Sequence, residues 1–114
     1  MTVYLCSVYS LDADKDLMQK RYEYTRKRLY KLLLTGTAFF SPIVHCHEVA
    51  KHHDMPKTWE FWEKLDLQYI DSCSSLSVLM MPGWERSVGI TAEIKYAVSI
   101  GKPISYLNCD DYND

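Results

Sequence analysis

The sequence lacks several features that would assign it at once to a broad class of protein. None of its 114 residues belongs to a run approaching the ~20 apolar residues that a membrane-spanning helix needs. Its formal net charge is only −2, which gives no electrostatic reason to expect a nucleic-acid polymer or an acidic membrane as partner. Residues 1–10 are apolar but have no basic leader, which favours a strand over an export signal. We therefore expect a cytoplasmic protein.

Paired metal-binding motifs are also missing. The four cysteines are widely spaced with no CxxC pair, so we expect free thiols in a reducing compartment. The histidines occur as HxH and HH around a single cysteine, a spacing that matches no common zinc site. A cysteine hydrolase built on this cluster is the weaker alternative. The sequence therefore predicts no metal site.

What is present indicates one domain, residues 1–114, with 47% hydrophobic and 25% charged residues, enough for a core. Apolar, β-branched segments predict strands at 2–7, 38–40, 75–81 and 103–107. Helical periodicity predicts helices from a cap at Asp12 or Asp14 to about residue 34, from 57 to 72, and between 82 and 101. Residues 43–55 are a loop or a short helix, and Pro56 is expected in the first turn of the second long helix.

This alternation of strands and helices predicts an α/β fold of the flavodoxin or Rossmann-like type. We expect a three-layer α/β/α sandwich around a four- to five-stranded, mainly parallel sheet. Ligands of such sheets bind at the carboxyl ends of the strands, where the strand order reverses. That rule brings residues 7–10, 41–47 and 82–89 to one edge.

Inward-facing apolar stripes are predicted on all three helices of this scheme. The stripes comprise Met18, Tyr22, Leu29, Leu32 and Leu33 on the first helix, Trp62, Leu65, Tyr69 and Cys73 on the second, and Ile90, Ile94, Ala97 and Val98 on the last.

The segment 82–103, PGWERSVGITAEIKYAVSIGKP, carries the most chemistry. Ser87 and Gly89 precede a helix, where a hydroxyl, backbone N–H groups and the helix dipole can hold a phosphate; an ordinary loop with a cap is the alternative. Arg86 either contacts such an anion or is simply exposed. We place Glu93 in the first helical turn, where the dipole favours its ionised form and suits it to nucleophilic attack on a glycosidic carbon.

Two further side chains are candidates for contact with a substrate. Asp66 lies beside the apolar stripe of its predicted helix, so it either points into the pocket or is a surface acid. Among the histidines, His45 is the best placed at the end of the second strand.

The ordered set of motifs resembles the nucleoside 2-deoxyribosyltransferase-like superfamily, which includes transferases and nucleoside 5′-monophosphate N-glycosidases. The similarity is greatest to a branch of small bacterial and phage proteins. It covers nearly the whole chain, and its motifs are VYLCSVYS, the G-x-x-F-F-S-P-I-x-H stretch ending at His45, W-x-x-x-D at Trp62 and Asp66, PGWERSVGITAEIKYA and GKPISYL.

This resemblance implies a role for each matching position. Glu93 matches the catalytic nucleophile, Tyr4 a tyrosine that orients it, and Asp66 an aspartate that contacts the sugar or assists departure of the base. Ser87 and Gly89 match the pair that holds the 5′-phosphate. The remaining expected substrate-binding residues are Ser7, Tyr9, His45, Trp62 and Arg86.

The resemblance also implies the activity and the setting. We expect hydrolysis, or base exchange, at the N-glycosidic bond of a nucleoside 5′-monophosphate, with a 2′-deoxy sugar and without a metal or organic cofactor. A nucleotide-binding protein of phage or bacterial origin that sequesters a signal is the alternative. The expected location is the cytoplasm of a bacterium or phage-infected host. The expected assembly is a homodimer or larger homo-oligomer, with the tail 108–114 as the segment that would complete a neighbouring site.

Overall fold

The structure is a computed structural model that describes residues 1–11 and 14–112. The elements, in chain order, are β1 (Thr2–Cys6), α1 (Lys15–Leu33), β2 (Ala38–Phe40), α2 (Pro42–His52), α3 (Trp59–Ser72), β3 (Ser75–Met80), the 3₁₀ turn η1 (Trp84–Arg86), α4 (Val88–Ser99) and β4 (Ile104–Asn108). Within the described ranges, no helix is both long and apolar enough to cross a membrane.

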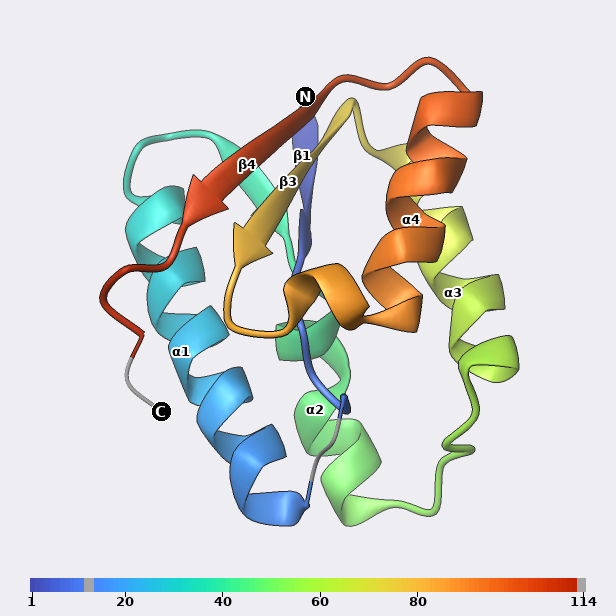
Figure 1. The fold of residues 1–114 in the computed structure, drawn as a ribbon. Coiled ribbons are helices and arrows are strands. Elements are labelled where there is room, and N and C mark those ends of the chain that lie inside the picture. The colour runs from blue at the N-terminus through green and yellow to red at the C-terminus, as the bar shows by residue number, and fades with distance from the viewer. Residues whose placement is uncertain (12–13, 113–114) are drawn as a thin grey trace.

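The four described strands form one parallel sheet in the order β2-β1-β3-β4. α1 covers one face, and α3 and α4 cover the other (Figure 1). The predicted three-layer α/β/α architecture is confirmed, with four strands. Connections leaving β1 and β3 run to opposite faces, so the strand order reverses between these two neighbours and opens a crevice at their carboxyl ends.

Local capping explains where the helices begin. Asp14 Oδ1 accepts a hydrogen bond from the Leu17 N–H at 2.8 Å and starts α1; the alternative cap, Asp12, lies outside the described residues. Ser41 Oγ accepts from the Val44 N–H at 3.1 Å, with Pro42 at the first helical position. The segment predicted as a loop or short helix is therefore a genuine helix, α2.

The prediction for Pro56 is wrong. α3 begins at Trp59 with Thr58 as its N-cap, three residues later than a first-turn proline requires. The Pro56 carbonyl instead accepts a hydrogen bond from Trp62 Nε1 at 2.8 Å. A side chain of the helix thus holds the preceding loop against α3.

The core lies between the sheet and its helices, around Leu5, Val78 and Leu79, which are fully buried. Leu33 and Val98 of the predicted stripes are exposed instead. Leu33 is 46% exposed because it lies in the last turn of α1, and Val98 is 64% exposed beside the inward-facing Ala97. The four cysteines, all among the described residues, are free thiols as predicted.

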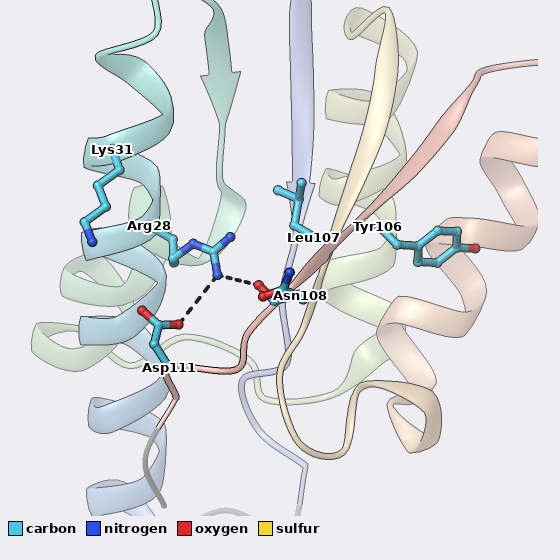
Figure 2. A pocket seen from close by; sticks show the side chains of 6 residues that line it. All are labelled: Arg28, Lys31, Tyr106, Leu107, Asn108 and Asp111. Atoms are coloured by element: carbon cyan, nitrogen blue, oxygen red, sulfur yellow. Dashed lines mark hydrogen bonds and ion pairs between the residues drawn. The ribbon is translucent and has the colours of Figure 1, made fainter.

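The described part of the tail folds back on its own chain. Arg28 of α1 donates to the Asn108 carbonyl at 2.8 Å and pairs with Asp111 at 4.0 Å (Figure 2). Tyr24 donates to the same Asp111 carboxylate at 2.6 Å. These contacts surround a hollow of about 410 Å³ at the outer edge of β4.

Candidate functional site

A cavity of about 1010 Å³ lies at the carboxyl ends of the strands. All four helices and the loop after β1 contribute to its wall. The loop after β1, the start of α2 and the turn before α4 meet here, as the strand-end rule predicts. The cavity is more than twice the volume of the hollow at β4, and a nucleotide-sized ligand fits such a volume.

Glu93 lies at the base of this cavity and is only 5% exposed. Because α4 begins at Val88, Glu93 is in the second helical turn, and the prediction of a first-turn position is wrong. The Tyr4 hydroxyl of β1 donates a hydrogen bond to Glu93 Oε2. The Cys6 thiol, two residues along the same face of the strand, is a second hydrogen-bonding neighbour of the carboxyl group.

Asp66 completes the buried polar cluster from α3. Its side chain is buried, and its carboxyl group is hydrogen-bonded to that of Glu93. Burial and the charge of Asp66 raise the pKa of Glu93 to about 8, and burial raises the pKa of Asp66 to about 6. At neutral pH the two carboxyl groups therefore share one proton.

The expectation that Glu93 is ionised is contradicted by this raised pKa. It rested on the positive potential at a helix start, which falls off after the first turn. At the observed position, loss of hydration and the neighbouring carboxylate outweigh that potential. The hydrogen bond from Tyr4 favours the ionised form but only offsets part of the increase in pKa.

The start of α4 forms one wall of the cavity. Ser87 is the N-cap, and its Oγ accepts from the Ile90 N–H at 3.2 Å, which leaves the hydroxyl proton available to a ligand. Val88 and Gly89, whose N–H groups have no acceptor within a helix, both line the cavity. A Cβ on Gly89 would lie 3.3 Å from the ring of Trp59, so glycine lets the indole pack against the helix start.

Ser7 supplies an unsatisfied polar group. Its side chain is 9% exposed, and its hydroxyl has no hydrogen-bond partner among the described residues. Buried hydroxyl groups without a partner are rare because each loses its hydration without compensation. Since Ser7 lines the cavity at the end of β1, a polar ligand atom would satisfy it.

The opposite wall, formed by α1 and α2, carries a second polar group of residues. Tyr9, Gln19 and His47 line the cavity and are joined by hydrogen bonds through the imidazole ring of His47. Burial lowers the pKa of His47 below its ordinary value, so its ring is neutral at pH 7.

One family matches the chain over nearly its full length. The matching family is described as "Domain of unknown function (DUF1937)", and the match covers residues 1–108. The chain belongs to the DUF1937 family. No curated protein matches it.

In this DUF1937 chain, several predicted site residues come together. Those that line the cavity are Ser7, Tyr9, Trp62, Asp66, Ser87, Gly89 and Glu93. Tyr4 lies beneath the cavity and contacts Glu93.

Two predicted residues lie elsewhere. His45 is exposed, outside the cavity lining, and its ring packs near Phe40 and Tyr69. Arg86 is exposed on the turn η1, also outside that lining. Within residues 1–11 and 14–112, no group of three His, Cys, Asp or Glu side chains is arranged to hold a metal ion.

The sequence analysis did not single out His47, the histidine whose side chain lines the cavity. His47 lies four residues after Ile43 and three before Ala50, on the same face of α2. Treating this segment as a helix would have identified that face. Cys6 and Trp59 were also missed, and their contacts with Glu93 and Gly89 join segments far apart in the sequence.

Proposed function

We propose that this protein cleaves the N-glycosidic bond of a nucleoside 5′-monophosphate, with a 2′-deoxy sugar as the expected substrate. The observation that carries the proposal is the buried Asp66–Glu93 pair sharing one proton at the base of a large cavity. Two carboxyl groups with different pKa values supply a nucleophile and an acid, which glycosidic cleavage requires.

Catalysis begins with transfer of the shared proton from Glu93 to Asp66. Tyr4 then stabilises the Glu93 carboxylate by its hydrogen bond and orients it. A Glu93 oxygen forms a bond to C1′ as the bond from C1′ to the base nitrogen breaks. The electron pair of that bond leaves with the base, which takes the proton from Asp66.

The second step restores the enzyme. A water oxygen bonds to C1′, the ester bond to Glu93 breaks, and its electron pair returns to the carboxylate. Asp66, now ionised, takes the proton from the water. If a second base takes the place of water, the same steps exchange one base for another.

The α4 wall supports a phosphate-bearing substrate. The Ser87 hydroxyl and the first N–H groups of a twelve-residue helix can bind an anion. The unpartnered Ser7 hydroxyl lies in the same cavity and can donate to the sugar or phosphate. A nucleoside without its phosphate would lose the contacts at the α4 wall.

The experiment is to incubate the protein with each of the deoxynucleoside 5′-monophosphates and their nucleosides and to measure free base by chromatography. We expect release from a monophosphate, at least 10²-fold slower release in Glu93→Gln, and little release from nucleosides. Glu85→Gln, which alters an exposed glutamate on η1, is the matched control and should release base at the wild-type rate. Equal rates in Glu93→Gln and the wild type would overturn the proposal.

A binding protein that sequesters a nucleotide is the second candidate, and one observation favours it. The raised pKa of Glu93 keeps its carboxyl group protonated at neutral pH, which suits a hydrogen-bond donor better than a nucleophile. Tight binding of a monophosphate by the wild type, with no base released over many hours, would select this function.

A further inference from the structure

A chain of hydrogen bonds crosses the α1–α2 wall of the cavity. The Tyr9 hydroxyl lies 2.6 Å from His47 Nδ1, and His47 Nε2 lies 3.0 Å from Gln19 Oε1. Gln19 Nε2 in turn lies 3.0 Å from a carboxylate oxygen of Glu23. The His47 ring is held by stacking on Tyr22, with centroids 3.9 Å apart and planes 13° apart.

Glu23, at the outer end of this series of hydrogen bonds, decides which groups donate and which accept. Gln19 Nε2 donates to the Glu23 carboxylate, whose oxygens accept, so the amide turns its NH₂ group to Glu23. Its carbonyl oxygen then faces His47 and can only accept, which places the imidazole proton on Nε2. Nδ1 of the neutral ring therefore accepts the proton of the Tyr9 hydroxyl.

The position of the hydroxyl proton decides what Tyr9 offers to a ligand. A phenol has one proton to donate, and burial with the charge of nearby Glu48 raises the pKa of Tyr9, so the hydroxyl keeps that proton. Because the proton is engaged by His47, the remaining lone pair of the Tyr9 oxygen can only accept a hydrogen bond.

The place of Tyr9 in the cavity indicates which part of a ligand it meets. The α4 start lies on the α3–α4 face of the sheet, and the Tyr9–His47–Gln19 wall is built from the loop after β1 and from α1 and α2 (Figure 1). Glu93, on α4, contacts Tyr4 and Cys6 of β1 and Asp66 of α3, and it lines the same cavity as Tyr9. If the phosphate binds at the start of α4 and C1′ lies at Glu93, the base is expected to contact the wall that carries Tyr9.

We propose that Tyr9, with its proton fixed by His47 and Gln19, selects bases that present an amino group over bases that present a carbonyl at the same position. This inference rests on the proposed nucleotide ligand but not on its cleavage. A carbonyl oxygen facing the Tyr9 lone pair would be repelled, whereas an amino group would be bound. Gln19 and His47 act as positioning residues, because they set the proton of Tyr9.

The test uses two pairs of nucleotides, dCMP with dUMP and dAMP with dIMP. In each pair a carbonyl group replaces the amino group, and the adjacent ring nitrogen changes from an acceptor to an N–H donor. Dissociation constants are measured by calorimetry at pH 7.5 in the Glu93→Gln background, so that no base is lost during the measurement. In at least one pair we expect the amino member to bind about 10-fold tighter, as one hydrogen bond gained against one repulsion predicts. Equal affinities within both pairs, or tighter binding of the carbonyl members, would overturn the inference.

Two variants separate this role from simple packing. Tyr9→Phe should reduce the ratio of the two dissociation constants in a pair to about one, because the nucleotide with the amino group binds more weakly. Gln19→Leu leaves Tyr9 in place but no longer fixes the proton on His47 Nε2. The Tyr9 hydroxyl can then donate to a ligand, so the nucleotide with the carbonyl group should bind more tightly and the ratio should fall. Tyr69→Phe, outside the cavity lining, is the matched control and should leave the ratio unchanged. A ratio that survives both Tyr9→Phe and Gln19→Leu would refute the assignment.

These experiments test the selection by Tyr9 and the glycosidase activity independently. A protein that shows the expected ratio but releases no base supports the selection by Tyr9 and refutes the glycosidase. A protein that cleaves amino and carbonyl members with equal affinity and rate supports the glycosidase and refutes the selection.

Discussion

Replacing Glu93 by Gln should make this protein more stable while slowing the proposed release of base at least 10²-fold. Glu93 is 5% exposed, and its pKa rises from 4.5 to about 8 on folding. Between these two values the folded state binds more protons than the unfolded state. The free energy of unfolding therefore falls as the pH rises through this range. The stability that the protein has below pH 4.5, where Glu93 is protonated in both states, is reduced until about pH 8, where the folded protein also releases the proton.

The size of the effect follows from the pKa shift. At pH 7 the unfolded chain has released the Glu93 proton and the folded protein still holds it, a penalty of about 3 kcal/mol at 1.36 kcal/mol for each pH unit above 4.5. Glutamine has the same shape, accepts from Tyr4 and carries no charge, so it escapes most of that penalty. With a slope of about 1.5 kcal/mol per M, the urea midpoint of Glu93→Gln should rise by roughly 2 M at pH 7.

The assay is urea unfolding of the wild type and Glu93→Gln at pH 5, 7 and 8.5. The gap between the two proteins should widen as the pH rises. Glu85→Gln, at an exposed position, controls for the loss of one negative charge and should track the wild type. A gap that stays constant with pH, or a Glu93→Gln protein less stable than the wild type at pH 8.5, would refute the reasoning.

Three further predictions concern the cavity. The pH profile of kcat/KM for base release should be bell-shaped with limbs near 6 and 8, since the carboxyl pair holds one proton only between those values; a rate rising steadily to pH 10 would contradict it. Ser87→Ala and Ser41→Ala each remove an N-cap and should each cost about 1 kcal/mol in urea unfolding. Only Ser87→Ala should also raise KM for a monophosphate, by about 10-fold, as the loss of one hydrogen bond to a charged group predicts. Gly89→Ala should weaken monophosphate binding because its Cβ presses on Trp59, and unchanged affinity measured by calorimetry would show that the helix start is not the phosphate site.

The fold was predictable because its signals are local. The apolar segments around Leu5 and Val78 are buried on both faces, which distinguishes strands of a parallel sheet from surface strands. Failures occurred where tertiary contacts decided the outcome. Pro56 lies before α3 because its carbonyl is held by Trp62, and His47 rather than His45 enters the cavity because α2 is a full helix.

The sequence by itself determined the α/β alternation, the turn before α4 and the presence of a glutamate near that turn, because periodicity and capping act over a few residues. Only the tertiary structure decided the charge of that glutamate. Tyr4, Asp66 and Glu93 come from β1, α3 and α4, and their contact removes water from two carboxyl groups at once. Loss of hydration depends on everything packed around a group, so no short stretch of sequence encodes the shared proton.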